Sequence, residues 1–192
     1  MSSIFVWLCV NWFKLKGWRI PRVVPVDLKQ YVLVVAPHTS NVDFPIGIAA
    51  RKIMNLNVKY VAKKELFKFP VRNTLLKLGG YPVDRSKKSS FVEKVAALFD
   101  KHVDFAVCIT PEGTRSRVTT WKTGFYHIAV MAGVPIVLVG FDYDLRVVVV
   151  SEPLRPSGDI EADMNKMHAF FSRIVPRHKE RSQYFDAQIS DK

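Results

Sequence analysis

Short apolar runs rich in β-branched residues are the feature of this sequence that most limits its fold. Such runs indicate strands buried on both faces, as in parallel sheets. Helical stretches lie at 42–54, 90–102, 121–133 and 159–175, and the last of these is long and amphipathic. Strands that alternate with helices predict an α/β fold, with a single domain and a mainly parallel central sheet flanked by helices. The apolar runs are YVLVVA (31–36), VKYVA (58–62), FAVCI (105–109), PIVLVG (135–140) and RVVVV (146–150).

The net charge narrows the classes of partner. The 192 residues include 29 Lys and Arg against 17 Asp and Glu, which leaves a formal charge of +12. A surface this basic attracts anionic partners such as nucleic acid, an anionic membrane or a phosphorylated substrate. The basic residues are spread along the chain, without a histone-like block or a zinc-knuckle pattern, so we expect no nucleic acid. The two cysteines have no paired spacing, which argues against a disulfide framework and for a reducing compartment.

The first twenty residues, MSSIFVWLCVNWFKLKGWRI, form an apolar stretch with three tryptophans, Trp7, Trp12 and Trp18. The stretch is too short to span a bilayer comfortably and lacks the cleavage site of a signal peptide. Tryptophans among apolar and basic residues favour a helix that lies in the membrane interface. We therefore predict an interfacial membrane-associating segment at 1–20 and a folded domain at 21–192. The alternative is an N-terminal helix packed on the core of its own domain.

The heptapeptide PHTSNVD follows the first apolar run directly. It places His38 five residues before Asp43, where a strand gives way to a helix. An imidazole can accept a proton near neutral pH, and a carboxylate on its other nitrogen orients the ring and stabilises the charged form. A turn at this point can bring Asp43 under the ring. The alternative is that Asp43, or one of residues 39–41, caps the helix while His38 is an incidental loop residue.

Two further loops carry groups suited to anions. TPEGTRSR (110–117) follows the FAVCI strand and offers the backbone of Gly113, the hydroxyl of Thr114 and the guanidinium of Arg115 to a phosphate. Glu112 could hold Arg115 or another base in position, and the alternative is a polar surface turn. GGYPVDRSKK (79–88) adds Arg85 as a second cationic point, although alone it reads as an ordinary loop. No histidine, cysteine or carboxylate set has metal-ligand spacing, so we expect no metal.

PHTSNVD, GGYPVDR, PEGTR and VPIVLVG resemble, in order and spacing, the four signature blocks of the glycerolipid acyltransferase family. This is the family of the bacterial 1-acylglycerol-3-phosphate acyltransferases, and the resemblance covers about residues 31–140. The first block of the family usually has Asn before the histidine, where this chain has Pro37.

The resemblance implies a glycerolipid acyltransferase fold and an acyl transfer without an acyl-enzyme. His38 would be the general base that deprotonates the acceptor hydroxyl, and Asp43 would orient and charge-balance it. No cofactor is implied, because an acyl thioester of CoA or of acyl carrier protein serves as co-substrate. The implied substrate-binding residues are Arg85, Glu112, Gly113, Thr114 and Arg115.

The implied acceptor is a lysophospholipid, above all 1-acylglycerol 3-phosphate, which would yield phosphatidate. Glycerol 3-phosphate and a lyso-amino-acid lipid are alternative acceptors. The implied location is the cytoplasmic face of the cell membrane, with peripheral or monotopic attachment to its anionic surface. A non-catalytic module that binds membranes or nucleic acid through its basic surface is a distant alternative, and it leaves the order of the four blocks unexplained.

Overall fold

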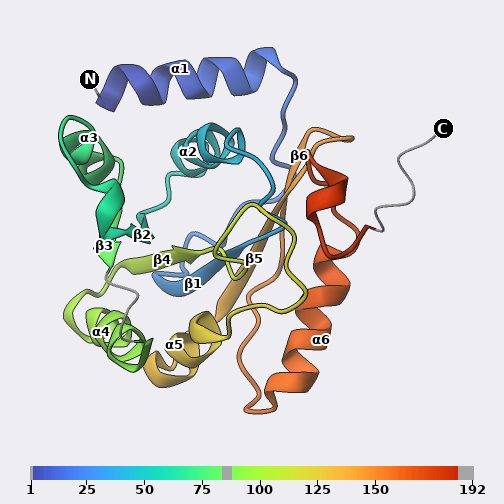
Figure 1. Cartoon of the computed structure of the whole chain (residues 1–192). Coiled ribbons are helices and arrows are strands. Elements are labelled where there is room, and N and C mark those ends of the chain that lie inside the picture. The colour runs from blue at the N-terminus through green and yellow to red at the C-terminus, as the bar shows by residue number, and fades with distance from the viewer. Residues whose placement is uncertain (1, 84–87, 186–192) are drawn as a thin grey trace.

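The computed structural model of the protein describes residues 2–83 and 88–185. Its centre is a six-stranded sheet in the order β3-β2-β4-β1-β5-β6 (Figure 1). The first five strands in this order are parallel, and β6 runs antiparallel to β5. The prediction of a mainly parallel sheet is therefore confirmed. The strands are β1 (Gln30–Val35), β2 (Val58–Lys63), β3 (Gly80–Val83), β4 (Phe105–Ile109), β5 (Ile136–Asp142) and β6 (Val147–Val150).

Helices cover both faces of the sheet (Figure 1). On one face lie α1 (Ser2–Leu15) and α2 (Asp43–Ile53), which pack against each other. On the other face lie α4 (Lys88–Lys101), α5 (Gly124–Ala132) and α6 (Ile160–Phe171). A short helix that the sequence did not predict, α3 (Arg72–Lys77), stands beside β3. Two 3-10 turns complete the structure, η1 (Lys64–Leu66) and η2 (Lys179–Arg181).

The central strand β1 explains why its apolar run is continuous. Leu33 and Val35 belong to the core beneath α1 and α2, whereas Val32 and Val34 belong to the core beneath α4, α5 and α6. Because successive side chains of a strand point to opposite faces, a strand with a core on each side needs an apolar residue at every position. In the strand order β1 has neighbours on both sides, so its carboxyl end lies near the middle of the sheet edge. Ligands of such folds bind at this edge.

The structure separates the three tryptophans that the sequence analysis grouped in one interfacial segment. Trp7 is 62% exposed, Trp12 is half-buried and Trp18 is buried. The reason is that α1 ends at Leu15 and the chain turns back at Gly17, whose φ of +74° favours glycine. Trp18 then packs under the helix, so only Trp7 remains well exposed. The side of α1 that carries Cys9 and Phe13 is part of the protein core.

Within residues 2–83 and 88–185, no helix is long and apolar enough to cross a membrane.

Candidate active site

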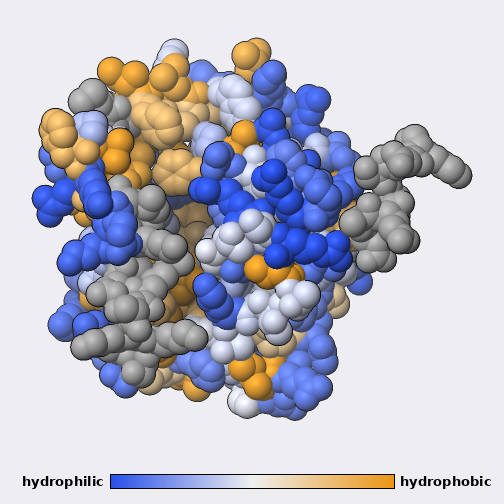
Figure 2. Space-filling view, viewed as in Figure 1, coloured by the Kyte–Doolittle hydropathy of each residue, from blue (hydrophilic) through white to orange (hydrophobic). Residues whose placement is uncertain are grey.

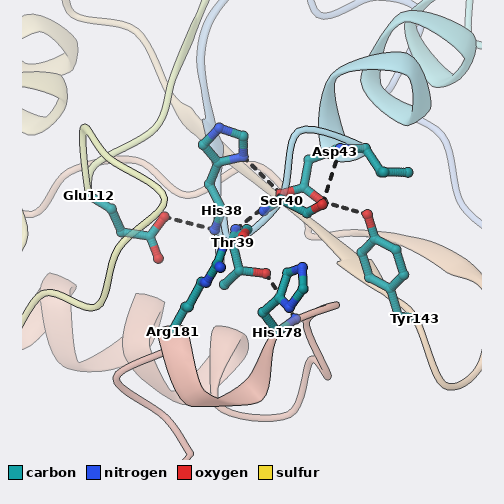
Figure 3. A network of polar contacts seen from close by, with 9 residues as sticks. His38, Thr39, Ser40, Asp43, Glu112, Tyr143, His178 and Arg181 are labelled. Atoms are coloured by element: carbon teal, nitrogen blue, oxygen red, sulfur yellow. Dashed lines mark hydrogen bonds and ion pairs between the residues drawn. The ribbon is translucent and has the colours of Figure 1, made fainter.

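The predicted dyad forms at the carboxyl end of β1. His38 lies in the loop between β1 and α2, and its Nδ1 is 2.9 Å from Oδ2 of Asp43, the first residue of α2 (Figure 3). A neutral ring that donates from Nδ1 keeps Nε2 as a free acceptor. In Figure 3 that second nitrogen points away from Asp43. The turn therefore brings the Asp43 carboxylate to the His38 ring, as the sequence analysis expected for a dyad.

Asp43 does not act as a simple helix cap. The N-cap position of α2 is Val42, which makes no side-chain cap hydrogen bond. The Asp43 carboxylate instead turns back toward the loop, where its Oδ2 accepts the backbone N–H groups of Thr39 and Ser40 at 3.1 and 3.0 Å. Its other oxygen, Oδ1, accepts the hydroxyl of Tyr143 at 2.6 Å. With 3% of Asp43 exposed, these donors replace the water that a carboxylate otherwise needs.

The Glu112 side chain supports the candidate base, His38, through a hydrogen bond to the His38 backbone. The residue follows β4, which pairs with β1, and its Oε2 accepts the backbone N–H of His38 at 2.8 Å. Only 5% of Glu112 is exposed, and this burial raises the pKa of its carboxyl to about 7, although the His38 N–H opposes the shift. The sequence analysis allowed Glu112 to hold either Arg115 or another base in position. The contact with the His38 backbone fits the second of these roles.

The raised pKa of Glu112 predicts a pH-dependent cost to stability. Below its ordinary pKa of 4.5 the carboxyl is protonated in both states, so it adds no pH dependence. Between pH 4.5 and 7 the unfolded chain loses this proton first, which lowers the free energy of unfolding by up to about 3 kcal/mol. We expect Glu112→Gln to gain stability relative to wild type as pH rises from 5 to 7, and then to level off.

Thermal unfolding of both proteins across this pH range measures the difference. Glu93→Gln, at an exposed position of α4, is the matched control and should show no such trend. Parallel curves for wild type and Glu112→Gln would contradict the assignment.

The remaining predicted anion-binding residues lie on the loop after Glu112. Gly113 has φ of +66°, and a Cβ there would lie 2.8 Å from Nζ of Lys122, so glycine leaves room for a second cation beside the loop. Thr114 and Arg115 are exposed, and Arg115 lines the same cavity as His38. The structure therefore brings one predicted cation to the dyad. Arg85 lies outside the residues that the structure describes.

An apolar cavity of about 500 Å³ extends from the dyad between the sheet and α2. Its size is typical of small-molecule sites. Cys108 lines it, but burial raises the pKa of this thiol to about 12, so it is not a thiolate near neutral pH. Its wall is mostly aliphatic and aromatic, and includes Leu33, Val35, Phe44, Ile48, Met54, Leu56, Val58, Tyr60, Val61, Val71, Leu75, Val139 and Phe141.

Residues from distant parts of the chain complete the site, and the sequence analysis did not identify them. Arg181 donates from its guanidinium to the backbone carbonyl of Thr39 at 3.3 Å, and the backbone N–H of His178 donates to the Thr39 hydroxyl (Figure 3). Tyr143 reaches Asp43 from the end of β5. A usable signal existed for Tyr143, because β5 is parallel to β1 and both strands end at the same sheet edge. No comparable pattern marks residues 178–181.

Comparison with known proteins places this site in a family. A family model described as Acyltransferase matches residues 18–142, a range that contains His38, Asp43, Glu112 and Arg115. The chain belongs to the acyltransferase family. It is 32% identical over 131 residues to the 1-acyl-sn-glycerol-3-phosphate acyltransferase of Salmonella typhimurium, covering 64% of this chain and 52% of that protein.

Other members of the acyltransferase family show similar coverage. The 1-acyl-sn-glycerol-3-phosphate acyltransferase of Escherichia coli K12 is 31% identical over 131 residues, again 64% of this chain and 52% of that protein. The protein of the same name from Haemophilus influenzae is 26% identical over 147 residues, 70% of this chain and 60% of that protein. The chain thus spans about half to three fifths of the length of these curated relatives.

Proposed function

We propose that this protein transfers a fatty acyl group from an acyl thioester to the free hydroxyl of a lysophospholipid, with 1-acylglycerol 3-phosphate as acceptor and phosphatidate as product. The observation that carries the proposal is the hydrogen-bonded pair of half-buried His38 and buried Asp43 in the wall of an apolar cavity that Arg115 also lines. The proposal assigns a base, a place for acyl chains and a cation for phosphate to residues that line this one cavity. The relatives are named 1-acyl-sn-glycerol-3-phosphate acyltransferases, which supports this acceptor.

The proposed reaction uses the acceptor hydroxyl as nucleophile. Nε2 of His38 takes the hydroxyl proton as the oxygen attacks the thioester carbonyl, and the imidazolium that forms is stabilised by Asp43. The tetrahedral intermediate collapses with cleavage of the C–S bond, and the proton on Nε2 passes to the departing sulfur. The products are the new ester and the free thiol of CoA or acyl carrier protein, so the chemistry requires no cofactor beyond the thioester.

The apolar cavity suits an acyl chain better than a polar substrate, because its aliphatic wall gains free energy by excluding water. The phosphate belongs at the Arg115 loop, where a guanidinium can bind two phosphate oxygens and Gly113 allows close backbone approach. Gly113, Thr114, Arg115 and Arg85 thus remain proposed ligands of the acceptor, while Glu112 acts through the His38 backbone.

A thiol-release assay with purified protein tests the proposal. Acyl-CoA and acyl carrier protein serve as donors, with 1-acylglycerol 3-phosphate, glycerol 3-phosphate or a lyso-amino-acid lipid as acceptor. The proposal expects release that depends on acceptor and is fastest with 1-acylglycerol 3-phosphate. Faster release with another acceptor would correct the acceptor assignment. Absence of release with every acceptor would overturn the acyl-transfer function.

The proposed location is the cytoplasmic face of the cell membrane, reached through an exposed apolar patch. We define this patch by exposed apolar residues of α1 and of the segment around α3, and Figure 2 shows apolar atoms gathered over both elements. Lys14, Lys68 and Arg72 are exposed beside them and suit an anionic lipid surface. Val71 belongs to the patch and also lines the cavity, so lipid substrates can pass from one to the other. The patch comprises Ile4, Trp7, Leu8, Leu15, Phe69, Val71 and Leu76.

Charges placed in this patch should release the protein from vesicles. Trp7 is 62% exposed and Phe69 is 95% exposed, so their replacement by Glu leaves the core intact and removes the largest aromatic contacts with lipid. We expect Trp7→Glu/Phe69→Glu to bind vesicles of phosphatidylcholine and phosphatidylglycerol about 10-fold or more weakly in a flotation assay. Val103→Glu, at an exposed apolar position in the α4–β4 loop, is the control. Equal vesicle binding by the double variant and the control would exclude the patch as the surface that contacts the membrane.

A further inference from the structure

The Asp43 carboxylate is held by two different sets of donors. Its Oδ2 receives His38, Thr39 and Ser40, which all come from the loop that the dyad itself forms. Its Oδ1 receives the hydroxyl of Tyr143, which stands 100 residues away in sequence at the end of β5. At 2.6 Å this is a short hydrogen bond to a buried charge, which is a strong kind in proteins.

Tyr143 is itself held on more than one side. Its ring packs against that of Trp18 in a T-shaped arrangement, with centroids 5.1 Å apart and an interplanar angle of 89°. Its backbone N–H donates to the carbonyl of Val175 at 2.8 Å. The neighbouring Asp142 accepts the N–H groups of Leu145 and Val175, which closes the turn between β5 and β6. The phenol therefore enters the site in one direction, and Figure 3 shows its hydroxyl pointing at Asp43.

We propose that Tyr143 is a positioning residue of the active site, whose hydroxyl holds Oδ1 of Asp43 so that Oδ2 stays aligned with His38 while the proton moves. The inference rests on the proposed function, in which His38 is the base. A carboxylate held only by Oδ2 is freer to rotate about its Cβ–Cγ bond, and small losses of alignment are costly in catalysis. Burial and the nearby Asp43 charge raise the pKa of Tyr143 well above its usual range, so the hydroxyl keeps its proton and remains a donor.

Tyr143→Phe tests the proposal because it removes the hydroxyl and keeps the ring that packs on Trp18. We expect kcat to fall about 10- to 30-fold, while KM for donor and acceptor changes less than about 2-fold, because the described residues that line the cavity do not include Tyr143. Because partial unfolding would also lower apparent kcat at constant KM, kcat is normalised to the folded fraction of each protein, measured by thermal unfolding.

Tyr126→Phe is a matched control. Tyr126 is buried, and its hydroxyl also donates to a buried carboxylate, that of Asp163 at 3.0 Å, but on the face of the sheet away from His38. This variant should lose stability to a similar extent and keep wild-type kcat. Wild-type kcat in Tyr143→Phe, or an equal loss of kcat in Tyr126→Phe, would overturn the proposal.

A double-mutant cycle shows whether Tyr143 acts through Asp43. In a background carrying Asp43→Asn, Tyr143→Phe should change kcat by less than about 2-fold, since the charge that it positions is gone. The same 10- to 30-fold loss in both backgrounds would place the effect elsewhere and contradict the inference. Absence of thiol release from the wild-type protein with every acceptor would instead overturn the proposed function, so the two failures are distinguishable.

Discussion

Replacement of His38 by alanine is expected to lower kcat for acyl transfer by about 10³- to 10⁴-fold. Without the imidazole, the hydroxyl must attack while it still carries its proton, and the departing sulfur has no proton donor. Asp43 cannot substitute, because its Oδ2 is engaged by the backbone of Thr39 and Ser40 and its Oδ1 by Tyr143. Thiol release and ester formation should fall together, because one group serves both steps.

The control for this variant is His127→Ala. His127 is exposed on α5, on the far side of the sheet from the cavity, so its loss should leave kcat unchanged. Thermal unfolding of both variants separates a lost base from a lost fold. A His38→Ala protein that turns over at the wild-type rate would mean that another group accepts the proton.

Replacement of Arg115 by alanine is expected to raise KM for 1-acylglycerol 3-phosphate about 100-fold, with kcat changed much less. A two-point contact between guanidinium and phosphate is among the stronger polar contacts in proteins, and the contact proposed for Arg115 does not involve the reacting hydroxyl. Binding that is equal in ground state and transition state appears in KM alone. Steady-state kinetics with varied acceptor measure the effect, and KM for the thioester should stay constant.

Two comparisons separate a local contact from general electrostatics. Arg155→Ala removes the same charge from an exposed loop before α6 and should leave KM for the acceptor within about 2-fold, since distant surface charges are screened. A monoacylglycerol acceptor, which has no phosphate, should be used equally well by wild type and Arg115→Ala. If Arg115→Ala affected only the thioester, the guanidinium would serve the donor instead.

Much of the fold followed from local patterns. The β1 run is apolar at every position because it faces two cores, and this alone indicates a sheet covered by helices on both sides. Placement of His38 and Glu112 near each other could also be expected, because β1 and β4 are parallel and their carboxyl ends meet at one edge. What could not be expected was α3, whose six residues carry too little periodicity to distinguish a helix from a loop.

Single side chains of the site also differ in how far local sequence predicts their contacts. The spacing of His38 and Asp43 admitted both a dyad and a helix cap. The choice depended on where the carboxylate turned, and that is settled by donors at residues 39, 40 and 143. Trp18 is a second case, since its sequence neighbours suggest an interfacial residue and only the turn at Gly17 places it against Phe13 and Tyr143.

By itself, the sequence determined the α/β architecture, the order of the motif-bearing loops and the residue types that we propose for handling a proton and a phosphate. These depend on periodicity and on chemistry within a few residues, which a single chain displays directly. Only the tertiary structure decided that Asp43 faces His38, that Tyr143 holds the second oxygen of Asp43 and that an apolar cavity joins the dyad to Arg115. The first of these depends on how one side chain turns within a loop, and the others join segments up to 100 residues apart. Parallel strands indicate which loops share a sheet edge, but the choice of side-chain partners there depends on packing that no local pattern records.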